Sequence, residues 1–135
     1  MNDPELVGEA SRWLRYAADD LDVANELLGG QRARHACFHA QQAVEKALKA
    51  ALVLDGQDVP YTHDLNALRN HLPESWLVRR EHPDLAELTV WAAESRYPGD
   101  WAEPTHADAT RVASAARSVL ESIVAEFQRR GVPSD

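Results

Sequence analysis

The sequence predicts an all-α protein, an up-and-down bundle of four to five helices. Apolar residues recur at steps of three and four over long stretches, which is the period of an amphipathic helix. Alanine is abundant and runs of β-branched residues are absent, a composition that favours helix over strand. A chain of 135 residues suits one domain. We therefore expect a single domain over residues 1–135, with a core from about residue 5 to about residue 130 and a short disordered tail.

The first predicted helix runs from about Pro4 to Leu28, and Gly29-Gly30 ends it, as glycine commonly does. One apolar stripe follows its length: Leu6, Ala10, Trp13, Leu14, Ala17, Leu21, Ala24 and Leu28.

The second predicted helix runs from about Ala33 to Leu54, and Asp55-Gly56 closes it. It carries an alanine stripe and a stripe of larger apolar residues, so it should lie centrally and touch several neighbours. The alanine side permits close helix approach, either inside the chain or across a dimer axis. The remaining side is a polar stripe: His35, His39, Gln42, Lys46 and Lys49.

A shorter helix is predicted after Thr62, which we expect to be its N-cap, and Pro73 stops it. The stretch Glu74 to His82 is predicted to be a loop with a turn of helix around Trp76. Pro83 fits the first position of a further helix that continues to about Arg96.

The pattern breaks at Pro98-Gly99 and resumes after Pro104. Thr105 and Asp108 have the spacing of a capping box, with aspartate in place of the usual glutamate. The apolar stripe of the last helix then extends to Phe127.

Bulk properties restrict the function. The formal net charge is -8 and the pI is about 5.2, which argues against broad electrostatic binding of nucleic acid but leaves room for a small local site. The single cysteine, Cys37, cannot form an internal disulfide. The acidic N-terminus lacks an apolar signal core, and no run approaches the length that spans a bilayer. We expect a cytoplasmic protein without membrane association.

Three stretches carry a family resemblance: "ACFHAQQAVEKALKAALVLDG", "THDLNAL" and "ESRYPGDWAEPTHADA". Together they resemble the HEPN domain (higher eukaryotes and prokaryotes nucleotide-binding) over roughly Trp13 to Phe127. The resemblance implies an up-and-down helical bundle, usually a homodimer. It also implies a minimal nucleotidyltransferase as partner, in some cases as a toxin–antitoxin pair.

Catalytic members of that superfamily are metal-independent ribonucleases with Arg, four to six residues, then His. Arg96 stands where the resemblance places the arginine, but Trp101 stands five residues later and Glu103 occupies the place of a tyrosine. An indole cannot exchange a proton as imidazole does. His106, ten residues after Arg96, is the next histidine and the remaining catalytic candidate. Whether the chain is an enzyme stays open.

Two groups of residues are candidates for ligand binding. Arg96, Tyr97 and Asp100, around the Pro-Gly break, could place a guanidinium on phosphate and a ring on a base. The alternative is a plain elbow between helices. The second group lies where lysine and a helix start could hold phosphate, and comprises His63, Asp64 and Lys46. Asp64 also suits the positive first turn of its helix, and His63 suits a structural hydrogen bond.

Two further patterns are weaker. Arg34 and His39 form an Arg-x4-His match outside the expected place. His35 and His39 are four apart, a spacing compatible with metal, but no third ligand is marked and a solvated polar stripe explains them. We expect no metal and no cofactor.

The sequence thus predicts a HEPN-like protein that binds nucleotide or RNA and works with a minimal nucleotidyltransferase. The alternatives are an endoribonuclease with a degenerate Arg/His motif and a pure protein-interaction module.

Overall fold

The computed structural model describes residues 3–91 and 103–133, and within those ranges it contains six helices and no strand. Three helices are long and three are short. In chain order they are α1 (Pro4–Gly29), α2 (Ala33–Leu54), α3 (Leu65–Asn70), α4 (Leu77–Glu81), α5 (Ala86–Thr89) and α6 (His106–Arg129). The predicted all-α bundle is confirmed, and the bounds of the long helices agree with the apolar periodicity.

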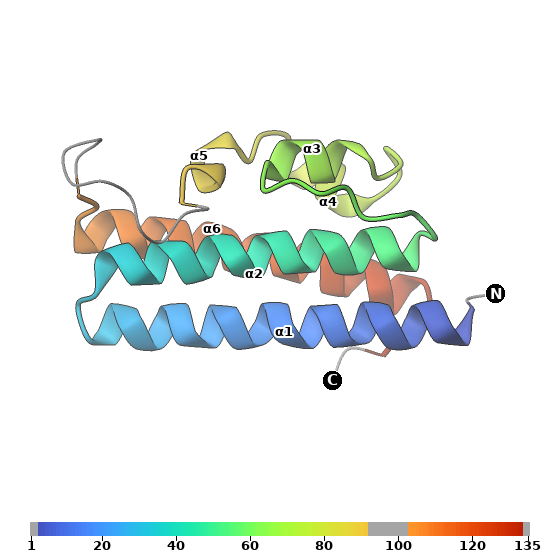
Figure 1. Ribbon diagram of the computed structural model, residues 1–135, viewed down its shortest axis with the longest axis horizontal. Helices are drawn as coiled ribbons and strands as arrows, with labels where there is room; N and C mark the ends of the chain where they lie inside the picture. The colour runs from blue at the N-terminus through green and yellow to red at the C-terminus, as the bar shows by residue number, and fades with distance from the viewer. Residues whose placement is uncertain (1–2, 92–102, 134–135) are drawn as a thin grey trace.

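The three long helices form the body of the bundle (Figure 1). α1 and α2 make an antiparallel hairpin, and α6 packs against both. The short helices α3, α4 and α5 pack on α2 and α6, on the side away from α1. α2 therefore has neighbours on several sides, which confirms the central place that its two apolar stripes predict.

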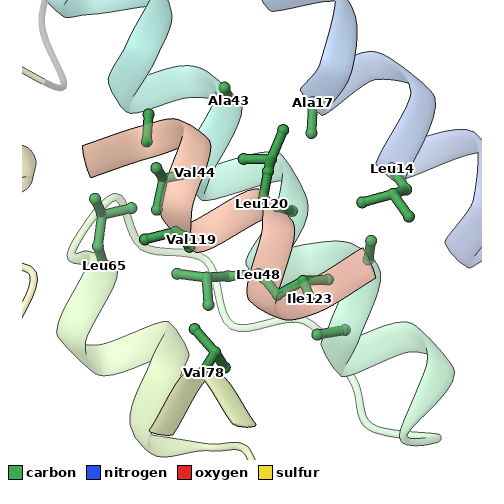
Figure 2. Packing of buried hydrophobic residues seen from close by; sticks show 14 of the residues in the cluster. Leu14, Ala17, Ala43, Val44, Leu48, Leu65, Val78, Val119, Leu120 and Ile123 are labelled. Carbon is green, nitrogen blue, oxygen red and sulfur yellow. The ribbon is translucent and has the colours of Figure 1, made fainter. Parts of the chain in front are cut away.

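The core lies where α1, α2 and α6 meet, and the short helices close it from one side (Figure 2). The long helices contribute Leu14, Ala17, Ala43, Val44, Leu48, Val119, Leu120 and Ile123, and the short helices add Leu65 and Val78. The alanine stripe of α2 is fully buried inside the chain; it comprises Ala36, Ala40, Ala43, Ala47 and Ala50. The alanine side thus serves close helix packing within one copy, rather than a dimer axis.

The starts of α1 and α3 follow from capping side chains. Asp3 accepts a hydrogen bond from the Glu5 amide at 2.8 Å, and Pro4 begins α1. α3 begins one residue after Asp64, whose carboxylate accepts from the amides of residues 66 and 67. The expected Thr62 cap is wrong by two positions, because the Thr62 hydroxyl accepts from the Asp64 amide instead and shapes the turn before the cap.

The predicted turn of helix around Trp76 is α4, which starts directly after it. α4 has no local cap. Its first amide, that of Leu77, donates to the Glu126 carboxylate of α6 at 2.8 Å. The acceptor lies 49 residues along the chain, so no local pattern marks this helix start.

The helix expected from Pro83 to Arg96 is wrong in its described part. Only α5 forms, because Asn66 of α3 fixes the chain before it: its side-chain oxygen accepts from the Leu85 amide at 2.8 Å, and its amide donates to Asp84 at 2.9 Å. These contacts hold residues 84 and 85 outside a helix. Residues 92–102, and with them the end of the expected helix, lie outside the described residues.

The predicted capping box at α6 is confirmed. The Asp108 amide donates to the Thr105 hydroxyl at 3.0 Å, and the Thr105 amide donates to the Asp108 carboxylate at 2.9 Å. The hydrogen bond from the Thr105 amide, with a smaller contribution from the Thr105 side chain, holds the pKa of the Asp108 carboxyl below its ordinary value.

Loss of this cap gives a testable change in stability. We expect Thr105→Ala to lower the free energy of unfolding by about 1 kcal/mol, because an orphan amide of α6 loses its acceptor. Thr110→Ala is the matched control, since the Thr110 hydroxyl only donates to a carbonyl one turn back. Urea unfolding followed by circular dichroism measures both. Equal effects of the two substitutions would contradict the capping role.

None of the described helices combines the length and apolar character that crossing a membrane requires.

Candidate functional site

The polar stripe of α2 is half-buried and tied to two carboxylates. Asp20 of α1 is the first: its oxygens lie 3.2 Å from Nδ1 of His39 and 2.5 Å from Nζ of Lys46. The Asp20 side chain is only 14% exposed. The expected solvated stripe is therefore wrong for His39 and Lys46, whose polar ends are anchored to α1.

Glu45 of α2 is the second carboxylate, and its side chain is 4% exposed. His63 Nδ1 lies 2.7 Å from one oxygen and Lys49 Nζ lies 3.1 Å from the other. Gln41, fully buried, donates to the same carboxylate at 3.4 Å. Burial alone would raise the pKa of Glu45, but the hydrogen bonds from His63 and Lys49 outweigh it and hold that pKa below its ordinary value.

The Glu45 contacts explain two of the sequence stretches that carry the family resemblance. "QQAVEKALKA" supplies Gln41, Glu45 and Lys49, and "THDL" supplies His63. The Lys49 ammonium also lies 5.5 Å from the centre of the Trp13 ring on α1, a cation–π distance. One buried carboxylate thus joins α1, α2 and the chain before α3.

This geometry bears on the second group of predicted ligand residues. Lys46 is engaged by Asp20, His63 by Glu45, and Asp64 by the first amides of α3. Lys46 and His63 hold different carboxylates and do not share one. Glu45 and Lys49 form an ion pair at i,i+4 spacing, and the structural hydrogen bond expected of His63 is made with Glu45 of α2.

Asp20 and Trp13 were not predicted as members of this network. They lie seven residues apart on α1, which places them on one helical face. That spacing is the feature of the sequence that could have grouped Trp13 with Asp20. Nothing in the neighbouring sequence indicates that this side of α1 packs against α2.

The first group of predicted residues falls mostly outside the described ranges. Arg96, Tyr97 and Asp100 lie within residues 92–102, as does Trp101. His106 is described: it is exposed and is the first residue of α6, and its carbonyl accepts from Thr110 at 2.9 Å.

α2 and α6 begin at the same end of the bundle (Figure 1). α2 starts without a capping side chain and without an acid in its first turn, and Arg34 Nη2 lies 3.4 Å from Nε2 of His35 there. Cys37, in the second turn of α2, is fully buried. Burial, with a smaller contribution from Asp108 and against the effect of Arg111, raises the pKa of its thiol to about 11. The thiol is therefore a packed side chain rather than a nucleophile.

Arg34 and His39 lie on different sides of α2. Five residues on an α-helix turn by about 140°, so the two side chains leave α2 in different directions. His39 turns toward Asp20 of α1. Among the described residues, no group of three histidine, cysteine or acidic side chains is placed to hold a metal ion.

Comparison with known proteins decides the family. The sequence model of the HEPN domain matches residues 10–127. The chain belongs to the HEPN domain family. The predicted resemblance is thereby confirmed over nearly the whole chain.

Two solved structures share the fold of this HEPN protein. The crystal structure of TT1696 from Thermus thermophilus aligns with a TM-score of 0.74 at 30% identity, covering 84% of this chain and 94% of that one. The structure of ST0689, described as an archaeal HEPN homologue, aligns with a TM-score of 0.67 at 26% identity, covering 87% of this chain and 97% of that one.

One curated relative matches locally. A protein from Methanocaldococcus jannaschii named "Putative toxin MJ1304" is 43% identical over 47 residues. The match spans 35% of this chain and 31% of that protein, about a third of the relative's length.

Proposed function

We propose that this HEPN protein binds a phosphorylated ligand, nucleotide or RNA, and acts as a homodimer with a minimal nucleotidyltransferase in a toxin–antitoxin pair. The observation that carries the proposal is the HEPN family match over residues 10–127. The relative named as a toxin supports the toxin–antitoxin setting.

The favoured place for phosphate is the end of the bundle where α2 and α6 begin. The N-cap residue of α2, Arg32, makes no side-chain capping hydrogen bond, and a helix start favours anions. Arg34 and His35 add basic groups at the same turn. We assign Arg96, Tyr97, Asp100 and His106 to this site as well, with Arg96 on phosphate and Tyr97 on a base.

Binding is favoured over cleavage for a chemical reason. Metal-independent RNA cleavage needs a group that takes and returns a proton, and Trp101 replaces the histidine of the family pattern. Lys46 and His63 are engaged by carboxylates, which makes them weaker phosphate ligands. The two imidazoles at this end of the bundle, His35 and His106, both stand outside the position of the family histidine.

Fluorescence anisotropy with a labelled single-stranded RNA and a labelled ATP analogue tests the binding site. We expect Arg34→Ala and Arg96→Ala each to weaken binding by about tenfold, the scale of one charge-assisted hydrogen bond. Arg80→Ala, an exposed arginine on α4, is the matched control and should bind as the wild type does. Unchanged affinity in both site variants, or no binding by the wild type, would overturn the proposed site.

The same RNA incubated with the protein in EDTA separates binding from catalysis. We expect no cleavage. Cleavage that disappears in both Arg96→Ala and His106→Ala would establish the endoribonuclease alternative instead. Growth arrest on expression of this chain, relieved by a co-expressed nucleotidyltransferase, tests the toxin–antitoxin part.

A further inference from the structure

One buried charge in the described part of the chain has no partner of opposite sign. The charged side chains buried there are Glu45, Glu126 and Arg69. Glu45 pairs with Lys49 and His63, and Glu126 pairs with two arginines. Arg69, on α3 and only 9% exposed, forms no ion pair with any described residue. A buried cation without a counter-ion destabilises a fold, so this arginine needs an explanation.

The hydrogen bonds of Arg69 are also incomplete. Its Nη1 donates to the Arg79 carbonyl on α4 over a long 3.4 Å, and its Nε is buried without a partner among the described residues. A guanidinium has five N–H donors and stays charged at neutral pH. An apolar side chain would fill the same space at a lower cost, so packing alone does not account for an arginine here.

Arg79 brings a second guanidinium to the same place. It is half-buried on α4, and its Nη1 donates to the carbonyls of Asn70 and Leu72 at the end of α3, at 3.1 Å and 2.7 Å. Each arginine thus reaches across the junction of α3 and α4 to the backbone of the other segment. All of these acceptors are neutral carbonyls, which orient a guanidinium but do not cancel its charge.

The electrostatic balance at this junction is unfavourable to the two cations. Burial first, and then the charge of Arg79, lowers the pKa of Arg69 below its ordinary value, although Asp84 acts in the opposite direction. Asp84 is not an ion-pair partner, because its Oδ1 accepts from the Asn66 side chain and from the Ala86 amide, each at 2.9 Å. The junction therefore lacks negative charge close to the two guanidinium groups.

We propose that Arg69 and Arg79 bind the phosphate group of a small molecule where α3 meets α4. The planar fork of a guanidinium matches the oxygens of a phosphate, and a phosphate dianion balances two positive charges. Arg79 is half-buried, so the junction is open to solvent on its side. α3 and α4 lie over the C-terminal half of α2, away from the starts of α2 and α6 (Figure 1). This phosphate site is therefore separate from the one in the proposed function.

Urea unfolding at neutral pH tests the site with inorganic phosphate and with AMP as probes, against sodium chloride at equal ionic strength. AMP carries a phosphate monoester that is mostly a dianion at this pH. A ligand that binds only the folded chain raises the ratio of folded to unfolded protein about tenfold at ten times its dissociation constant. We expect such a rise in the wild type at about 10 mM probe, which corresponds to a dissociation constant of about 1 mM.

Two substitutions remove the site in different ways. Arg69→Met replaces the buried cation by an unbranched apolar side chain. We expect it to abolish the rise with both probes and to leave the stability in chloride unchanged or higher. Arg79→Lys keeps a charge and a donor for the α3 carbonyls but loses the fork, and should raise the dissociation constant at least about fivefold. Arg80→Met makes the same charge change at an exposed position of α4 and is the matched control, which should respond as the wild type does.

The outcomes distinguish this site from a structural arginine and from the site at the other end of the bundle. A wild type that neither probe stabilises overturns the proposal, and so does a rise that persists in Arg69→Met. A rise that is lost in Arg34→Ala but kept in Arg69→Met assigns the phosphate to the starts of α2 and α6 alone. If Arg69→Met is unstable or does not fold, an unchanged dissociation constant in Arg79→Lys makes Arg69 structural and overturns the site. Equal rises with both probes support free phosphate as the ligand, and a larger rise with AMP supports a nucleotide.

Discussion

Replacing Trp76 with alanine should lower the free energy of unfolding by about 3–5 kcal/mol, the usual cost of emptying a buried aromatic site. Trp76 is fully buried where the short helices close the core, directly before α4. The Arg130 guanidinium lies 4.3 Å from the centre of its ring, so the substitution also removes a cation–π contact. A domain of this size has a total stability of only about 5–15 kcal/mol, so the loss takes a large share. Urea unfolding followed by far-ultraviolet circular dichroism measures it.

Trp76→Phe is the control that keeps an aromatic ring in the same place. The indole Nε1 of Trp76 is buried and has no hydrogen-bond partner among the described residues. Phenylalanine removes that unpaired donor, which offsets part of the cost of the smaller ring. We expect a loss within about 1.5 kcal/mol. A loss as large as that of the alanine variant would contradict the view that ring packing dominates.

The long helices are predictable because their causes are local. The bounds of α2 and α6 follow from an apolar period repeated over many turns. The start of α6 follows in addition from the capping box, a motif that spans only the four residues from Thr105 to Asp108. The short helices depend on distant contacts instead. The first amide of α4 donates to the carboxylate of Glu126 on α6. The Asn66 side chain holds the chain before α5 outside a helix. A prediction from apolar periodicity alone does not include this contact, and it therefore made the helix after Pro83 too long.

The polar network shows the same division. The Glu45–Lys49 pair follows from i,i+4 spacing on one helix and could be predicted. The contacts of Glu45 with His63 and of Asp20 with Lys46 join positions 18 and 26 residues apart. On a sequence, half-buried polar residues at helical spacing look the same as exposed ones, because only the packing of α1 on α2 distinguishes them.

Glu45→Gln should lower the free energy of unfolding by about 2 kcal/mol at pH 7, the scale of hydrogen bonds to a charged group. Glutamine keeps the shape and can still accept from Gln41, but it cannot pair with the Lys49 ammonium. The pKa of Glu45 in the folded chain lies below its ordinary 4.5. Its carboxylate therefore stabilises the fold fully above about pH 4.5, and this contribution is lost as the pH falls through the folded pKa.

The difference in stability between wild type and Glu45→Gln should accordingly be large at neutral pH and shrink in acid. Urea midpoints measured from pH 7 down to about pH 3, below the ordinary pKa of a glutamate, follow it. Glu9→Gln, an exposed glutamate on α1, is the matched control without effect. A difference that stays constant into acid would mean that shape rather than charge makes Glu45 important.

Because Glu45 holds Lys49 and His63 in place by internal contacts, the variant should lose stability while keeping its affinity for RNA. A selective loss of RNA binding at unchanged stability would move the phosphate site from the starts of α2 and α6 to this carboxylate and its partners.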